Sequence, residues 1–232
     1  MEAFNPIERA REVEKIVVKG DQRLYYKFRY QEYYNGVATA DTIGCNILCA
    51  YCWNYARNQN PAATKGAVFK TPGEVAIRLN GICEKKRINT VRISGAEPFL
   101  GEASTKHIAA VLKACKGREF IIETNGLMLG FKPELIDLIK PFKPYVRLTI
   151  KGDSNDQFEK VTGAKGEFFD YQLEAYHELK MRHVETGIAI MPEFVSYRTI
   201  KSMVQHQIET EGLIPYGGIG KRLKERGIEK YK

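Results

Sequence analysis

The sequence contains no long apolar run and few of the features that mark specialised classes of protein. No stretch approaches the roughly 18 consecutive apolar residues that a membrane-spanning helix needs. The charged amino-terminal segment lacks the apolar core of a secretory signal. Internal repeats and low-complexity linkers are also absent, so a solenoid or a disordered chain is excluded. These absences predict a cytoplasmic protein with no membrane partner.

Acidic residues are outnumbered by basic ones, and this is the unusual feature of the composition. The 232 residues include 36 Lys and Arg against 28 Asp and Glu, which gives a net charge of +8. The hydrophobic fraction of 44% suffices for one folded domain with a sizeable core. The charge excess permits an anionic partner but does not identify one.

Cysteine is scarce and unevenly distributed. The five cysteines are an odd number, which disfavours a disulfide framework. Cys83 and Cys115 recur with apolar residues at helical spacing and are predicted to lie in the core. Cys45, Cys49 and Cys52 instead lie within eight residues of one another, so their thiolates can converge on one metal centre.

The cysteine triplet has no fourth partner nearby. Zinc normally takes four ligands, and no histidine or further cysteine is close in sequence, so a structural zinc site is disfavoured. Four cysteines close the usual iron–sulfur cluster. Three would hold three irons of a [4Fe–4S] cluster and leave the fourth iron open to a chelating ligand.

Short apolar segments alternate with helical ones, which predicts an α/β fold with a parallel sheet. Because there are six predicted strands, we expect a partial (β/α)6 barrel rather than a closed eight-stranded one. The predicted strands are Val37–Ile43, Thr90–Ser94, Glu119–Glu123, Tyr145–Ile150, Gly187–Met191 and Gly212–Pro215. A capping box at Thr71 and Glu74 begins one helix, and others are predicted over Ser104–Lys116, Pro133–Lys140, Glu167–Arg182 and Tyr197–Glu211.

Polar residues and glycines gather where the predicted strands end. The cysteine triplet follows the first strand, and the segments 94–98, 123–126, 151–153 and 191–193 follow the next four. The carboxyl ends of parallel strands share one face, and ligands bind there. The sequence therefore predicts a binding site on this face.

With these motifs the sequence resembles the radical S-adenosylmethionine (radical SAM) superfamily. The segment 45–52 reads C-N-I-L-C-A-Y-C, as in the C-x3-C-x2-C signature with an aromatic residue before the last cysteine. The segment 94–98 reads S-G-A-E-P, close to the superfamily's Gly-Gly-Glu-Pro motif. The likeness extends over roughly residues 38–216 and implies the superfamily's partial TIM-like barrel, preceded here by an extra amino-terminal element.

The resemblance implies a role for particular residues. Cys45, Cys49 and Cys52 would bind a [4Fe–4S] cluster. The residues that would bind S-adenosylmethionine (SAM) are Tyr51, Ser94, Gly95, Glu97, Pro98, Thr124, Asn125, Thr149, Lys151 and Ile190. Among them, Tyr51 and Ile190 would lie near the adenine, and Lys151 would approach the methionine carboxylate.

The resemblance also implies an activity. A cluster reduced by a one-electron donor such as ferredoxin or flavodoxin would cleave SAM to a 5′-deoxyadenosyl radical. That radical would abstract hydrogen from an unknown protein or small-molecule substrate. Small activating enzymes of the pyruvate formate-lyase activase type are the nearest resemblance, through their length and the Leu213-Ile214-Pro215-Tyr216 segment.

Other interpretations stay open at the two ends of the chain. Residues 1–36 form a predicted aromatic-rich element, residues 37–216 the core domain, and residues 217–232 a basic tail with six basic and two acidic residues. Aromatic and basic residues together are typical of RNA-binding surfaces. A packed element and a solvated helix are the simpler interpretations. A radical SAM enzyme that modifies tRNA or another RNA, and a non-catalytic metal- or nucleic-acid-binding module, are the alternative functions.

Trp53, the one tryptophan, directly follows Cys52. It is predicted either to pack in the core or to shield a cluster from solvent.

Overall fold

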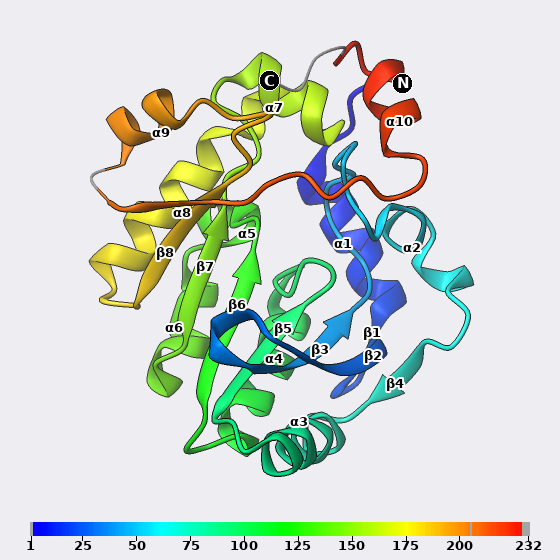
Figure 1. Ribbon diagram of the computed structural model, residues 1–232, viewed down its shortest axis with the longest axis vertical. Helices are drawn as coiled ribbons and strands as arrows, with labels where there is room; N and C mark the ends of the chain where they lie inside the picture. The colour runs from blue at the N-terminus through cyan, green and yellow to red at the C-terminus, as the bar shows by residue number, and fades with distance from the viewer. Residues whose placement is uncertain (1, 205, 229–232) are drawn as a thin grey trace.

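Six parallel strands form the centre of the molecule. The computed structural model describes residues 2–204 and 206–228. Neighbouring parallel strands follow one another in chain order (Figure 1): β3 (Val37–Thr42), β5 (Thr90–Ser94), β6 (Glu119–Thr124), β7 (Tyr145–Thr149), β8 (Thr186–Ile190) and β9 (Ile208–Thr210). The predicted α/β class and partial barrel are confirmed.

Antiparallel strands from the amino-terminal region extend one edge of this sheet. β2 (Gln22–Gln31) pairs with β3, and β1 (Val18–Lys19) and β4 (Val68–Lys70) both pair with β2. At the other edge, β9 pairs only with β8 among the described strands, so the barrel stays open. The aromatic stretch of the amino-terminal region is thus part of the sheet, with Tyr25 buried and bonded to His107.

Helices connect the parallel strands. α3 begins at the predicted capping box, where Glu74 N donates to Thr71 Oγ1 and Thr71 N donates to Glu74 Oε2. Cys83 on α3 and Cys115 after α4 are buried, as predicted. The described α-helices are α1 (Pro6–Val17), α2 (Tyr55–Gln59), α3 (Pro72–Lys86), α4 (Glu102–Ala114), α5 (Leu127–Phe131), α6 (Glu134–Ile139), α7 (Asn155–Thr162), α8 (Asp170–Met181), α9 (Tyr197–Met203) and α10 (Ile219–Glu225). None of these helices is long and apolar enough to cross a membrane.

The last strand lies earlier in the chain than predicted. The strand expected at 212–215 is wrong, because the segment that pairs with β8 is Ile208–Thr210. The helix expected over 197–211 ends at Met203, and Val204 is extended. Ion pairs from Arg147 on β7 to Glu209 and Glu211 anchor the strand in this register. The helix expected from residue 167 begins only at Asp170, after a short 3-10 turn over Gly166–Phe168.

Helix α1 was not predicted, although its start carries a clear signal. The Asn5 side chain accepts hydrogen bonds from the backbone N–H groups of Ile7 and Glu8, and Pro6 occupies the first turn. The helix packs against the turn that leads into the cysteine loop. A Cβ atom on Gly44, whose φ is +90°, would lie 2.6 Å from Val13 Cγ1, so only glycine lets α1 approach this closely.

Two helical glycines give a matched test of the packing of α5 on α8. A Cβ on Gly130 would lie 2.0 Å from the Tyr171 carbonyl oxygen, whereas a Cβ on Gly81 meets nothing within 4 Å. We expect Gly130→Ala to lower the free energy of unfolding by about 1–3 kcal/mol, because the two helices must separate. Gly81→Ala should raise it by about 0.5–1 kcal/mol through helix propensity. Urea unfolding of both variants measures the difference, and equal effects would contradict the close approach of α5 and α8.

Candidate functional site

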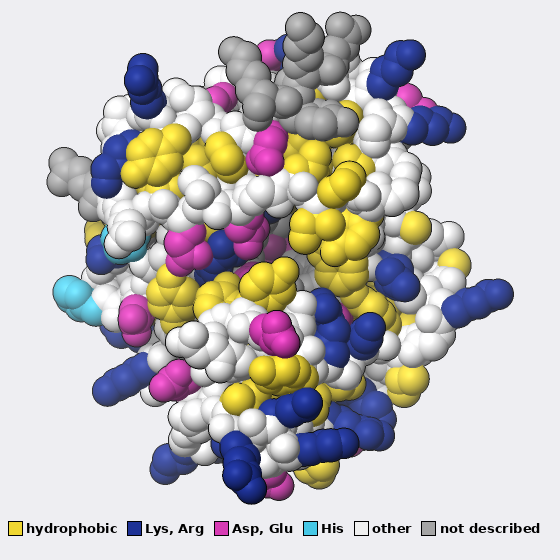
Figure 2. Space-filling view, in the orientation of Figure 1, with side chains coloured by type: hydrophobic (Ala, Val, Ile, Leu, Met, Phe, Trp, Pro, Cys, Tyr) yellow, Lys and Arg dark blue, Asp and Glu magenta, His cyan; other side chains and the backbone are white. Residues whose placement is uncertain are grey.

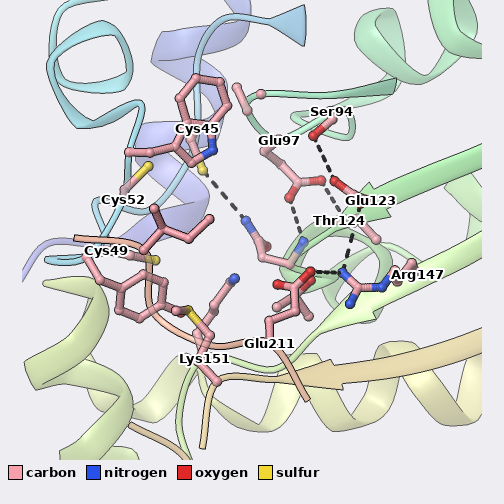
Figure 3. Close-up of a pocket in the computed structure, with 18 of the residues that line it drawn as sticks. Cys45, Cys49, Cys52, Ser94, Glu97, Glu123, Thr124, Arg147, Lys151 and Glu211 are labelled. Atoms are coloured by element: carbon pink, nitrogen blue, oxygen red, sulfur yellow. Dashed lines mark hydrogen bonds and ion pairs between the residues drawn. The ribbon is translucent and has the colours of Figure 1, made fainter. Parts of the chain in front are cut away.

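A cavity of about 740 Å³ opens at the carboxyl ends of the parallel strands. Its size lies within the range of small-molecule sites. Figure 2 shows the hollow near the middle of this face, with acidic and basic side chains inside it and hydrophobic ones beside it. In Figure 3 the cysteines lie on one side of the cavity, and Glu123, Arg147 and Glu211 lie on the opposite side.

The cysteine loop between β3 and α2 is held by backbone hydrogen bonds. Cys52 N donates to the Cys49 carbonyl at 2.9 Å and closes a turn. The N–H groups of Leu48 and Ala50 donate to the carbonyls of Thr162 and Val161, at the end of α7. The loop therefore has a defined conformation, with all three thiols lining the cavity.

The three thiols suit a multi-iron cluster better than a single ion. The described residues include no group of three or more His, Cys, Asp or Glu side chains placed to hold one metal ion. Burial raises the pKa of each thiol, that of Cys52 to about 11, so thiolates here need a strong positive partner. Three soft sulfur ligands spaced around a cavity fit an iron–sulfur cluster with one open iron.

The loop after β5 carries the Ser94–Pro98 motif and depends on a glycine. Gly95 has a φ of +90°, and a Cβ there would lie 3.0 Å from the Thr42 carbonyl oxygen. The Gly95 carbonyl accepts a hydrogen bond of 2.7 Å from Asn54 Nδ2, which ties this loop to the end of the cysteine loop. Ser94, Gly95 and Glu97 all line the cavity, as predicted for a ligand-binding loop.

The carboxylate of Glu97 joins the loop after β5 to the loop after β6. It is 3% exposed and accepts hydrogen bonds from Thr124 Oγ1 at 2.6 Å, Asn125 N at 2.8 Å and Phe99 N at 3.1 Å. Burial raises its pKa to about 7, although these three donors act in the opposite direction. Glu97 therefore positions Thr124 and Asn125.

Arg23, on β2, supports the same loop and was missed by sequence reasoning. It is fully buried, and its guanidinium donates to the carbonyls of Glu97 and Pro98, both at 2.6 Å. A buried arginine so far from the motif in sequence gives no local signal. Pro98, predicted to bind ligand, contributes its carbonyl to this contact and does not line the cavity.

Asn125 connects the loop after β6 to the cysteine loop. Its Nδ2 atom donates to Asn46 Oδ1 at 2.8 Å and lies 3.8 Å from Cys45 Sγ. Its carbonyl accepts a hydrogen bond of 2.5 Å from Gln172 on α8. Asn46 and Gln172 do not line the cavity but support Asn125, and sequence reasoning did not single them out.

Lys151 and Tyr51 lie together at the end of β7. The Lys151 ammonium is 5.6 Å from the centroid of the Tyr51 ring, and Tyr51 stacks on Phe194 at 4.6 Å. Lys151, labelled in Figure 3, lines the cavity together with Thr149 and Tyr51. Ile190, predicted to face it, is instead enclosed in the core, and its neighbour Met191 lines the cavity.

The inner wall of the partial barrel carries a network of paired charges. Arg92 donates to Glu123 at 2.9 Å, and Arg147 lies 2.9 Å from Glu211 and 2.7 Å from Glu209. Ser94 Oγ and Tyr34 OH also donate to Glu123, at 2.7 and 3.0 Å. Side chains two residues apart on a strand point to the same face of the sheet. Arg92 and Arg147 each lie two residues before a predicted site residue on the same strand, so this spacing could have identified them.

Aromatic side chains form the rim of the cavity. Trp53 is 42% exposed, so the first of its two predicted places, in the core, is wrong, and it lines the cavity instead. Its ring lies 6.4 Å from the rings of Tyr26 and Tyr216, and the Arg29 guanidinium lies 5.6 Å from it. Leu213, Ile214 and Tyr216 also line the cavity, although the segment 212–215 is not a strand.

The fold and the site define a barrel-type α/β protein with a cysteine-lined ligand cavity at the strand ends. The sequence pattern of the Radical SAM superfamily matches residues 40–205. The chain belongs to this superfamily. Its members are enzymes that use a [4Fe–4S] cluster and SAM.

Several curated proteins share this core. GTP 3′,8-cyclase from Clostridium perfringens is 28% identical over 118 residues, which cover 51% of this chain and 35% of that protein. The FeMo cofactor biosynthesis protein NifB from Frankia alni is 28% identical over 132 residues, covering 54% and 25%. This chain thus spans about a third or less of the length of these relatives.

Solved structures share the fold at low sequence identity. A radical SAM methyltransferase from Sphaerobacter thermophilus superposes with a TM-score of 0.55 and 12% identity, over 86% of this chain and 66% of that one. The structure of anSMEcpe with bound AdoMet and a peptide gives a TM-score of 0.53 and 16% identity, over 74% and 48%.

The charged inner wall predicts a pH dependence of stability. Burial opposes ionisation of Glu123, but Arg92 and Arg147 overcome it and lower its pKa below the ordinary value of 4.5. The lowered pKa stabilises the fold above pH 4.5, and this contribution is lost as the pH falls through the lowered value. Glu123→Gln should therefore lower the free energy of unfolding by about 2 kcal/mol near pH 7. In this variant the free energy of unfolding should also fall less steeply as the pH is lowered.

Urea unfolding between pH 3 and 7 measures this effect. Glu102→Gln is the matched control, because Glu102 also pairs with lysines but lies exposed at the surface. In the control variant, the fall in the free energy of unfolding at acid pH should be nearly the same as in the unmodified chain. If Glu123→Gln loses stability in acid as steeply as the unmodified chain does, Glu123 is not the ionised group with a lowered pKa that we describe.

Proposed function

We propose that this cavity is the active site of a radical SAM enzyme, in which Cys45, Cys49 and Cys52 bind a [4Fe–4S] cluster. The observation that carries the proposal is the position of these three thiols, which line the same cavity as the loops after β5, β6 and β7. When bound, the cluster would supply the one-electron reduction that cleaves SAM. The protein binds and orients the reactants and excludes water.

The residues near the cysteines are suited to bind SAM. Lys151 offers a positive charge to the methionine carboxylate, and the described structure records no ion pair for it. The backbone of residues 94–97, which line the cavity, would bind the methionine amino group. Asn125, held by Asn46, Gln172 and Glu97, presents its amide beside Cys45. Tyr51, backed by Phe194, offers an apolar ring face to the adenine.

We infer that the substrate is a small polar molecule bound against the charged inner wall. Arg147 and Glu123 lie opposite the cysteines (Figure 3), and Arg92, which donates to Glu123, also lines the cavity. These side chains can orient charged or hydrogen-bonding groups. The aromatic rim around Trp53 would cover such a molecule. A ferredoxin- or flavodoxin-like protein would supply the electron.

The activase-like subtype stays a prediction, because the similar proteins include a cyclase and a methyltransferase. An RNA substrate is less favoured, because two of the six basic residues of the tail, Arg222 and Arg226, donate to backbone carbonyls of the protein itself.

Substitution of the cysteines tests the cluster assignment. After anaerobic reconstitution, the unmodified chain should bind about four irons and produce 5′-deoxyadenosine from SAM and dithionite. Cys49→Ala should lose the iron and the product, because a thiolate ligand is missing. Cys83→Ala is the matched control, since Cys83 is also buried but lies outside the cavity, and this variant should retain both the iron and the product. A chain that takes up iron but leaves SAM intact would favour a non-catalytic module.

Substitution of Lys151 tests the SAM site separately from the cluster. Lys151→Gln should keep its iron but weaken SAM binding roughly 10- to 100-fold, because a charge-assisted hydrogen bond is lost. Anaerobic calorimetry on the reconstituted protein measures the dissociation constant. Lys160→Gln, on the exposed surface of α7, is the control and should bind SAM normally. Unchanged affinity in Lys151→Gln would remove this residue from the site.

A further inference from the structure

The basic segment near the carboxyl end reaches back to the cysteine loop. After β9 the chain crosses the molecule (orange to red in Figure 1) and forms α10. Arg222 Nε donates to the Ala50 carbonyl at 2.8 Å, and its Nη2 donates to the Cys52 carbonyl at 3.2 Å. Arg226 Nη2 donates to the Leu48 carbonyl at 2.6 Å. A helix expected to be merely solvated therefore contacts three alternate residues of the loop.

These contacts are built into the surrounding structure. Ile219 and Leu223 are buried on the inner side of α10, so the helix is packed in place. Arg226 Nη1 also donates to the Val161 carbonyl at 2.9 Å, at the end of α7. Gly163 makes room for this guanidinium, because a Cβ there would lie 3.0 Å from both of its terminal nitrogens. Arg222 further lies 4.5 Å from the centroid of the Tyr55 ring on α2.

The arginines fix which way the peptide groups of the loop point. In a trans peptide the carbonyl of one residue and the N–H of the next point in opposite directions. Because the Leu48 carbonyl faces Arg226, the N–H of Cys49 points the other way. The same geometry turns the N–H of Tyr51 away from Arg222. Hydrogen bonds to cluster sulfurs and nearby charge both tune the reduction potential of iron–sulfur centres.

We propose that Arg222 and Arg226 are positioning residues that hold the cysteine loop in the conformation that binds the cluster and raise the cluster's reduction potential. This inference rests on the proposed function only for the identity of the bound group. The positioning itself belongs to the protein chain and can be measured without iron. The two arginines lie beyond the part of the chain that matches the superfamily pattern, which ends at residue 205.

The first experiment measures the loop in the iron-free protein. Alkylation by iodoacetamide is followed for each cysteine by mass spectrometry in the unmodified chain and in Arg222→Gln/Arg226→Gln. We expect the double variant to react at least threefold faster at Cys49, which is 7% exposed in the clasped loop. Cys83 and Cys115 are internal controls, and their unchanged slow reaction shows that the fold is intact. Unchanged reactivity of Cys49 would overturn the proposal.

The second experiment measures the reconstituted cluster. Lys221→Gln/Lys224→Gln removes the same two charges from exposed positions of the same helix. We expect the arginine variant to lose iron faster to a chelator and to shift the midpoint potential to more negative values. The lysine variant should do neither, and Arg222→Lys/Arg226→Lys should restore part of both properties.

The outcomes separate the two proposals. Equal potential shifts in the arginine and lysine variants would show that only net charge matters, which overturns a positioning role. Failure of the unmodified chain to bind iron would overturn the proposed function. The alkylation result would still decide whether the arginines hold the loop.

Discussion

The buried carboxylate of Glu97 is the interaction on which the candidate site depends. The Glu97 side chain accepts hydrogen bonds from the loop after β5 and from the loop after β6. The buried Arg23 donates to the Glu97 carbonyl and holds the backbone of the loop after β5. A side chain with three donors and almost no exposure has one position available to it. Glu97 fixes the position of Asn125, and Asn125 in turn bonds to Asn46 in the cysteine loop. Loops that belong to three different strands thus act as one rigid surface.

The charged inner wall of the barrel does not serve stability alone. Burying arginines and glutamates together seldom stabilises a fold more than a well-packed apolar core would. Arg92 and Arg147 nevertheless both pair with Glu123 on the strand between theirs, and Arg147 also pairs with Glu211 just after β9. These side chains line the cavity and make it polar, and the pairs of Arg147 with Glu209 and Glu211 hold β9 in its register. Such a charged wall favours binding of a polar ligand, at some cost in the stability of the fold.

The sequence predicted features whose signals are local. The strands before the strand-end motifs, the capping box at Thr71 and the core cysteines were found because periodicity and spacing report them directly. The register of β9 was missed, because it is set by ion pairs to Arg147 on a strand some 60 residues earlier. Arg23 and Gln172 were missed for the same reason, since each acts on a loop far away in the chain. Ile190 was assigned from a motif, and burial in the core decided its actual place.

The return of α10 to the cysteine loop has a consequence for the order of events during synthesis. Arg222 follows Ala50 by 172 residues, and Arg226 follows Leu48 by 178. At about 5–20 residues per second, the ribosome makes the loop roughly 9–36 s before its arginine partners. Until then the outward carbonyls of the loop have only water to satisfy them. The cysteine loop therefore gains these contacts only after the chain has been made through Arg226.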